Sequence, residues 1–219
     1  MRPHRFLTAV FLFAATLGAA GEPIRIAEVR PLAGADAPRA SHEFSLHAYT
    51  FRGTRWSAAE IESGIAAAAR LLEQCGVTLA AADLRTIEAP RAFHYYHTPT
   101  SRRMLRSLEI MRPAVFFVED THNLPAFDAE AVGLANSKAR PELANTVWVA
   151  YGARDLPQAI AHELVHVLSD DGAHSRDTGN LMQDETSTLN TRLTAKQCSL
   201  LRTRGEANGV LRRRPAPPS

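Results

Sequence analysis

Apolar residues recur at helical spacing in the segment that begins at Ser57. Ser57 and Glu60 form an S-x-x-E capping box, in which the two side chains accept hydrogen bonds from backbone amides at the first turn of a helix. The apolar positions that follow lie three or four residues apart: Ile61, Ile65, Ala68, Ala69 and Leu72. Gly76 stands where helices commonly end in a left-handed residue. The pattern therefore predicts a long amphipathic helix over residues 58–75.

Shorter apolar stretches on either side of this helix have the patterns of strands. Residues 43–51 alternate between apolar and polar side chains well enough for a strand with one buried face. Residues 114–119 and 146–151 are nearly continuous apolar runs, which are typical of buried strands. Strands that mix with helices in a chain of 219 residues predict one α+β (mixed α/β) domain.

The first twenty residues differ from the rest of the chain. Arg2 and Arg5 precede an apolar run over residues 6–17, and residues 18–20 (Gly-Ala-Ala) are the small residues that a signal peptidase recognises. The run is shorter than the roughly 20 residues that a helix needs to span a bilayer. We therefore expect residues 1–20 to be a secretory signal peptide. The exported chain would lie in the periplasm or outside the cell, without a stable membrane anchor.

The remaining chain divides into three parts. Residues 21–41 are rich in Ala, Pro, Gly and Arg, and they predict a flexible leader. The periodic segments between them and the end of the last expected helix predict one folded domain over residues 42–206. Residues 207–219 end in a basic and proline-rich stretch, which we interpret as a disordered tail.

The charge balance argues against one class of partner. Of the 25 basic residues, Arg2 and Arg5 lie in the signal segment, and the remaining 23 balance the 23 acidic residues. Nucleic-acid-binding domains usually carry an excess of basic residues, so we expect no nucleic-acid partner.

The chain has two cysteines, Cys75 and Cys198. An even number of cysteines in a chain bound for an oxidising compartment favours a disulfide between them. Two buried free thiols are the alternative that the sequence leaves open. Cys198 lies in a last predicted helix, which a capping box opens at Thr194 and Gln197. The disulfide would join this helix to the end of the first long helix.

The motif H-E-L-V-H at residues 162–166 carries the candidate chemistry. It lies in a predicted helix that opens with a D-x-x-Q capping box beginning at Asp155. His162 and His166 are four residues apart, so a helix places both imidazoles on one face, where they suit two nitrogen ligands of a tetrahedral zinc ion. Glu163 is offset by one residue. It can therefore lie beside the metal without binding it and accept a proton from the attacking water.

This motif and the residues after it resemble the metzincin clan of zinc peptidases. The metzincin pattern is H-E-x-x-H-x-x-G-x-x-H, followed by a tight turn that carries a methionine beneath the metal. The residues that match are His162, Glu163 and His166, then His174 as the third histidine and Met182 as the methionine. The resemblance is to small exported bacterial members. It implies a zincin-like single domain with a twisted mixed sheet, a long backing helix, an active-site helix and a C-terminal helix.

The resemblance also implies the activity of a zinc-dependent endopeptidase. Zinc would be held by His162, His166 and His174, and Glu163 would be the general base. A protein or peptide substrate would lie extended and antiparallel to an edge strand above the active-site helix, where backbone groups can pair. We interpret residues 131–137 as that edge strand, and we expect the protein to be a monomer.

The spacing after the motif departs from the family pattern. Family spacing would put glycine at position 169 and the third histidine at position 172, whereas this chain has Ser169 and Gly172. We expect the helix to run on to about Asp171. Gly172 would then supply the left-handed turn that ends it, so that His174 can reach back to the metal.

Two other interpretations stay open. A zincin of another clan would use a carboxylate as its third ligand, and Glu185 follows the motif at a workable distance, although the helix motif that usually contains this glutamate is missing. Closer carboxylates are Asp170, Asp171 and Asp177. The second alternative is an exported, non-catalytic zinc-binding module of the same fold. Glu163 argues against it, because zinc binding alone does not need that residue.

Overall fold

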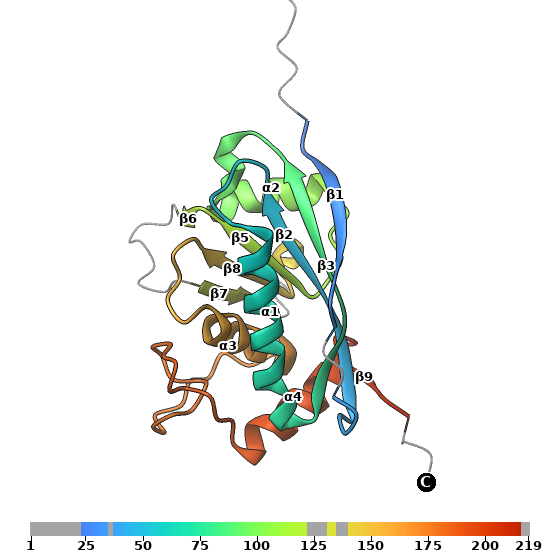
Figure 1. Ribbon diagram of the computed structural model, residues 1–219, viewed down its shortest axis with the longest axis vertical. Helices are drawn as coiled ribbons and strands as arrows, with labels where there is room; N and C mark the ends of the chain where they lie inside the picture. Colours follow the sequence, from blue (N-terminus) through green and yellow to red (C-terminus); the bar gives the residue numbers. More distant parts are fainter. Residues whose placement is uncertain (1–22, 35–36, 122–130, 135–139, 216–219) are drawn as a thin grey trace, which may run out of the picture.

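A mixed sheet forms the centre of the computed structural model, which describes residues 23–34, 37–121, 131–134 and 140–215. The main path through the sheet is β1-β3-β2-β5-β8-β7. The bounds of these strands are β1 Arg25–Leu32, β2 His42–Phe51, β3 Val77–Glu88, β5 Ala114–Val118, β7 Ala131–Leu134 and β8 Thr146–Ala150. The inner strands β3, β2, β5 and β8 run parallel, and the outer strands β1 and β7 are antiparallel to their neighbours. Figure 1 shows the twist of the sheet and β1 along one border.

Short elements complete the chain. Strand β9 (Arg212–Arg213) pairs with β2, and β4 (Tyr95–Tyr96) pairs with β6 (Asp120–Thr121) in a small second sheet. Among the described residues, single turns of 3-10 helix lie at Glu73–Cys75, Arg91–His94 and Pro141–Leu143.

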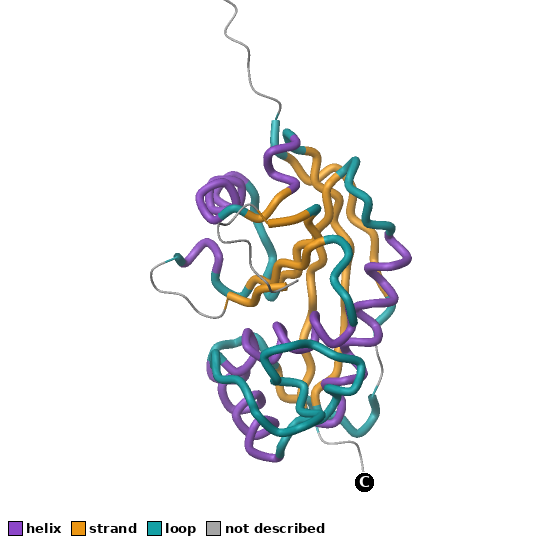
Figure 2. Tube along the Cα trace, turned by 90° about the vertical axis from the view of Figure 1, so that its left-hand side faces the viewer, coloured by secondary structure: helices purple, strands orange, loops and turns teal. Residues whose placement is uncertain are grey.

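Helices pack on both faces of the main sheet. Helices α1 (Ala58–Leu72) and α3 (Leu156–Ser169) share one core with the sheet, and α2 (Thr98–Ser107) packs in the core on the opposite face. Successive side chains of a strand point to opposite faces, so Val115 and Phe117 enter the first core, whereas Phe116 and Val118 enter the second. Figures 1 and 2 show the sheet between these helices. Helix α4 (Ala195–Ala207) packs against α3 near the C-terminus.

The first predicted helix is confirmed. α1 is followed directly by the 3-10 turn, so the two cover residues 58–75. Ser57 accepts from the Glu60 backbone amide, and the Glu60 side chain accepts from the Ser57 amide. Gly76 ends the segment in the left-handed region with φ of 68°.

Each of the two parts that we expected to be unstructured contains a strand of the sheet. The expected flexible leader at residues 21–41 contains β1, which pairs with β3 from Arg25 to Leu32. The expected disordered tail at residues 207–219 contains β9, and Val210 and Leu211 just before it are buried. Composition did not reveal these strands, because their stability depends on hydrogen bonds to residues that are distant in the sequence.

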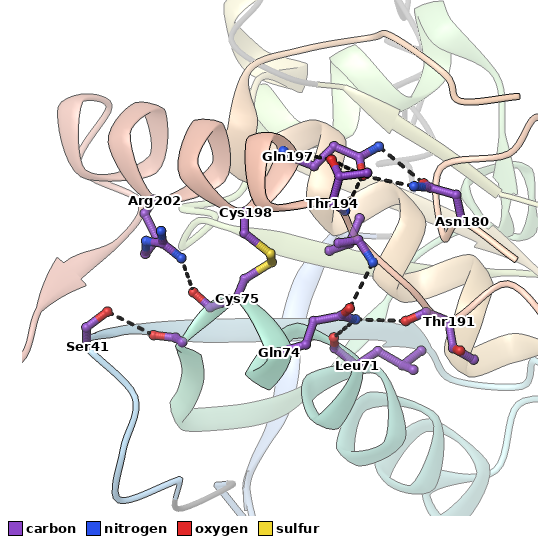
Figure 3. The surroundings of a disulfide bond; sticks show 12 residues. Ser41, Leu71, Gln74, Cys75, Asn180, Thr191, Thr194, Gln197, Cys198 and Arg202 are labelled. Carbon is purple, nitrogen blue, oxygen red and sulfur yellow. Dashed lines mark hydrogen bonds between the residues drawn. A yellow bond between two sulfur atoms is a disulfide. The ribbon is translucent and has the colours of Figure 1, made fainter. Parts of the chain in front are cut away.

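Cys75 and Cys198 form a disulfide, which confirms the predicted pairing. Figure 3 shows that it joins the end of the first helical segment to α4. Next to it, the Gln74 side chain donates to the Thr191 carbonyl oxygen and accepts from the Leu193 amide. The end of the first helical segment is therefore tied both to α4 and to the loop before it.

Among the described residues, no helix combines the length and the apolar character required to cross a bilayer. The expected signal peptide at residues 1–20 lies outside the described residues, as do residues 135–137 of the expected edge strand.

Candidate metal centre

Helix α3 contains two of the candidate metal ligands, His162 and His166. It begins at Leu156 and ends at Ser169, and His162 and His166 are both buried. The expected capping box at its start is absent, because Asp155 takes a left-handed conformation and its side chain makes no cap hydrogen bond. The helix is held in place by its apolar sides, which pack into the core with α1 and the sheet.

The end of α3 also differs from the expectation. The helix stops two residues earlier than we expected, and Asp170 rather than Gly172 takes the left-handed conformation, with φ of 47°. Aspartate is one of the few side chains that adopt this conformation without a large cost. The amides of Asp170 and Asp171 both bond to the His166 carbonyl oxygen, so the chain turns back immediately. His174 lies beside the helix histidines as predicted, but the residue that makes the turn is Asp170 rather than Gly172.

Three imidazole nitrogens meet at one point. The Nε2 atoms of His162 and His166 lie 3.0 Å apart, and His174 Nε2 lies 3.1 Å from that of His166 and 3.3 Å from that of His162. Among the residues that the structure describes, these histidines are the one group of three or more His, Cys, Asp or Glu side chains whose ligand atoms converge in this way. The alternative carboxylates Asp170, Asp171, Asp177 and Glu185 are not part of this group.

The other nitrogen of each ring determines what these Nε2 atoms are. His162 Nδ1 lies 2.8 Å from the Leu181 carbonyl oxygen, and His166 Nδ1 lies 2.6 Å from that of Asp171. His174 Nδ1 lies 2.5 Å from Asp184 Oδ1. Carbonyl and carboxylate oxygens only accept hydrogen bonds, so each Nδ1 must carry a proton. In a neutral ring, Nε2 then has no proton and offers its lone pair.

Three lone pairs that face one another cannot hydrogen-bond to one another, and they form a ready site for a cation. On a tetrahedral zinc ion with Zn–N bonds of about 2.0–2.1 Å, ligand nitrogens lie about 3.3 Å apart. The three observed separations are close to that value. The donor set and its spacing therefore fit a metal ion.

Burial keeps two of the rings in the neutral form that binds metals. Loss of solvation lowers the pKa of His162 to about 4, and it also lowers the pKa of His166. His174 differs, because 41% of its side chain is exposed. The group is thus buried on the helix side and open to solvent on the side of the loop.

Glu163 points from α3 toward the edge strand β7. The Gly133 backbone amide donates a hydrogen bond to its carboxylate, and burial raises the pKa of Glu163 to about 7. A Cβ atom on Gly133 would lie 2.5 Å from Glu163 Oε2, so a larger residue there would displace this carboxylate from its position. Glu163 thus follows the candidate ligand His162 on α3, and its carboxylate contacts the edge strand β7.

Met182 is buried in the turn that follows His174. The Met182 amide donates to Asn180 Oδ1, and the two amide groups of Asn180 and Gln197 bond to each other. Gln197 also caps α4, and Figure 3 shows this arrangement. The turn contains Leu181, whose carbonyl oxygen accepts from His162. The packing of α4 therefore holds the turn that orients one of the three rings.

Sequence reasoning missed two residues that contact the site. Asp184 has no motif around it that distinguishes it from neighbouring acidic residues, and only the turn brings it to His174. Gly133 lies in the expected edge strand, but its contact with Glu163 depends on how β7 packs on α3. A glycine in the middle of a strand signals a close backbone approach, and that signal could have identified it.

Comparisons with known proteins support the fold. No protein-family model matches the sequence, and no curated protein matches it. A solved structure with a similar fold is that of metalloproteinase-II from Bacteroides fragilis, with a TM-score of 0.52 and 14% sequence identity. The match covers 81% of this chain and 57% of that protein, so this chain spans little more than half of its length. The mixed α+β architecture fits a zincin-like metalloproteinase fold, and its three converging histidines can hold a metal ion.

Proposed function

We propose that the protein is an exported zinc-dependent endopeptidase of the metzincin type. The observation that carries this proposal is the convergence of three histidine lone pairs at spacings that suit one tetrahedral zinc ion. His162, His166 and His174 would hold the metal. The similar fold of a bacterial metalloproteinase supports a peptidase, and the disulfide between Cys75 and Cys198 is consistent with an oxidising destination.

The catalytic role that we propose for Glu163 rests on its position and surroundings. When bound, zinc would polarise the scissile carbonyl and make its water more acidic. Glu163 follows the first ligand directly on α3, and its carboxylate is held by the Gly133 amide. It would accept the proton of the attacking water and then pass it to the leaving amine. A non-catalytic zinc module would have no use for a buried carboxylate held in this way.

The outer strand β7 is the proposed place for the substrate. It is antiparallel to β8, packs on α3, and has a second edge without a strand partner among the described residues. An extended protein or peptide substrate could pair with that edge and so lie across the three histidines. We further propose that the enzyme acts as a monomer.

The test combines metal binding and peptide cleavage on one preparation. Metal-free protein should bind one zinc ion per chain and should then cleave a mixture of proteome-derived peptides. A chelator should abolish the cleavage, and zinc should restore it. Glu163→Gln is the matched control, because it should bind zinc and leave the peptides intact. Zinc binding without any cleavage in the wild type would overturn the peptidase and favour the binding module.

The same preparation distinguishes the zincin with a carboxylate ligand. Glu185→Ala and His174→Ala should be compared for zinc affinity. Loss of zinc binding in Glu185→Ala, with His174→Ala binding like the wild type, would replace the metzincin assignment.

A further inference from the structure

The rings of the three histidines are held by different kinds of acceptor. The two on α3 donate to backbone carbonyl oxygens, those of Leu181 and Asp171. His174 donates to a side chain, the carboxylate of Asp184, at 2.5 Å. One ring of the site therefore has a hydrogen-bond partner that can be substituted without changing the backbone.

His174 is also the ring that most needs an external partner. His162 and His166 are buried on a packed helix, so their side chains have little freedom. His174 lies in a loop, and 41% of its side chain is exposed. Its ring contacts the other two histidines, with ring centres 5.2 and 5.0 Å away, but these contacts do not determine which nitrogen faces them.

We propose that Asp184 is the positioning residue for His174 in the zinc site, an inference that rests on the function proposed above. Its carboxylate accepts a hydrogen bond from Nδ1–H of His174. This bond keeps the proton on Nδ1, leaves the lone pair on Nε2 and turns Nε2 toward the two helix histidines. The negative charge also offsets part of the charge of a divalent ion held by three neutral rings. Carboxylate partners of this kind commonly improve metal affinity 10- to 100-fold.

The surrounding turn explains why Asp184 and not another acidic residue takes this role. The Met182 carbonyl oxygen accepts from the Ser175 amide at 2.7 Å, so the two sides of the loop are joined next to His174. Asp184 follows that junction by two residues. Asp171 is closer to α3 in the sequence, but its carboxylate accepts a hydrogen bond from the Ala173 amide, and its carbonyl oxygen accepts one from His166 Nδ1.

The position of Asp184 makes the inference open to a clean test. Its side chain is 81% exposed, so its removal should leave the fold intact. Asp184→Ala removes both the acceptor and the charge, whereas Asp184→Asn keeps an acceptor oxygen and removes only the charge. Glu185→Gln is the matched control, because it removes the neighbouring negative charge.

The measurement is the zinc dissociation constant of each metal-free variant, determined by competition with a chromophoric chelator. We expect Asp184→Ala to bind zinc 10- to 100-fold more weakly, Asp184→Asn to show a smaller loss, and Glu185→Gln to bind like the wild type. The cobalt-substituted proteins provide a second readout. The visible spectrum of Asp184→Ala should change, since the third ligand is no longer held in one orientation. Thermal unfolding of the metal-free variants should be unchanged.

His174→Ala separates failure of this inference from failure of the proposed function. If His174→Ala binds zinc as tightly as the wild type, the three-histidine site itself is wrong. If His174→Ala loses zinc while Asp184→Ala keeps wild-type affinity and spectrum, only the role of Asp184 is overturned. An equal loss in Glu185→Gln and Asp184→Ala would also overturn it, because the effect would then be one of general charge.

Discussion

Gly133 and Glu163 are in direct contact across the gap between the edge strand β7 and helix α3. The Gly133 amide donates to the Glu163 carboxylate, and a Cβ atom on Gly133 would lie 2.5 Å from Glu163 Oε2 and 3.0 Å from the Glu163 carbonyl oxygen. A Cβ atom at these distances would force the neighbouring atoms to move. The strand thus determines the position of the residue to which we assign the proton transfer.

Gly133→Ala should therefore lower kcat at least about tenfold, because the displaced carboxylate loses part of the 10²- to 10⁴-fold that a positioned general base contributes. Zinc content should stay at the wild-type level. Steady-state kinetics and metal analysis on the same sample provide the measurement. Gly172→Ala is the matched control, since a Cβ atom there meets nothing within 4 Å and the residue does not need a left-handed conformation. Wild-type kcat in Gly133→Ala would show that the contact has no role in catalysis.

Glu163→Gln should keep the zinc and lose at least about a hundredfold in peptidase rate, because glutamine fills the same space but cannot accept the proton. The Gly133 amide can still donate to its side-chain oxygen, so the fold should be preserved. Metal content and turnover must be measured together. If turnover is unchanged in a fully zinc-loaded sample, Glu163 is not the base.

Zinc should stabilise the folded chain. A ligand that binds only the native state at a concentration 100 times its dissociation constant contributes about 2.7 kcal/mol. For a domain of this size, that corresponds to a rise in Tm of roughly 5–10 °C. Thermal unfolding of the metal-free protein with and without zinc measures it. The double variant His162→Ala/His166→Ala should show no rise, and an equal rise in that variant would locate the zinc elsewhere.

Loss of the disulfide should destabilise the whole domain. The bridge joins Cys75 to Cys198 across 123 residues and ties α4 to the end of the first helical segment. We expect the double variant Cys75→Ser/Cys198→Ser to lose about 2–4 kcal/mol of unfolding free energy. Urea unfolding of oxidised wild type, reduced wild type and the variant gives the comparison. The reduced wild type should match the variant, and equal midpoints for all three would contradict the prediction.

Alkylation of the unreduced exported protein checks the same pair chemically. Intact mass should show no added label before reduction and two labels afterwards. Two reactive thiols before reduction would mean that the exported protein does not form this disulfide.

Local signals in the sequence determined the elements that depend on near neighbours. The S-x-x-E box at Ser57 and the apolar spacing after it suffice for α1, because a helix is made of contacts three and four residues apart. The same rule places His162 and His166 on one face and Glu163 beside them, before any tertiary contact is known.

Tertiary structure decided the features that depend on distant residues. Strands β1 and β9 exist through pairing with β3 and β2, so residues with a loop-like composition became part of the sheet. At the end of α3, the turn falls on Asp170, although glycine has the stronger intrinsic preference for that conformation. The contacts of Gly133 with Glu163 and of Asp184 with His174 also join separate segments. Hydrogen bonds and packing between distant segments have no fixed spacing along the chain, and for this reason only the folded molecule reveals them.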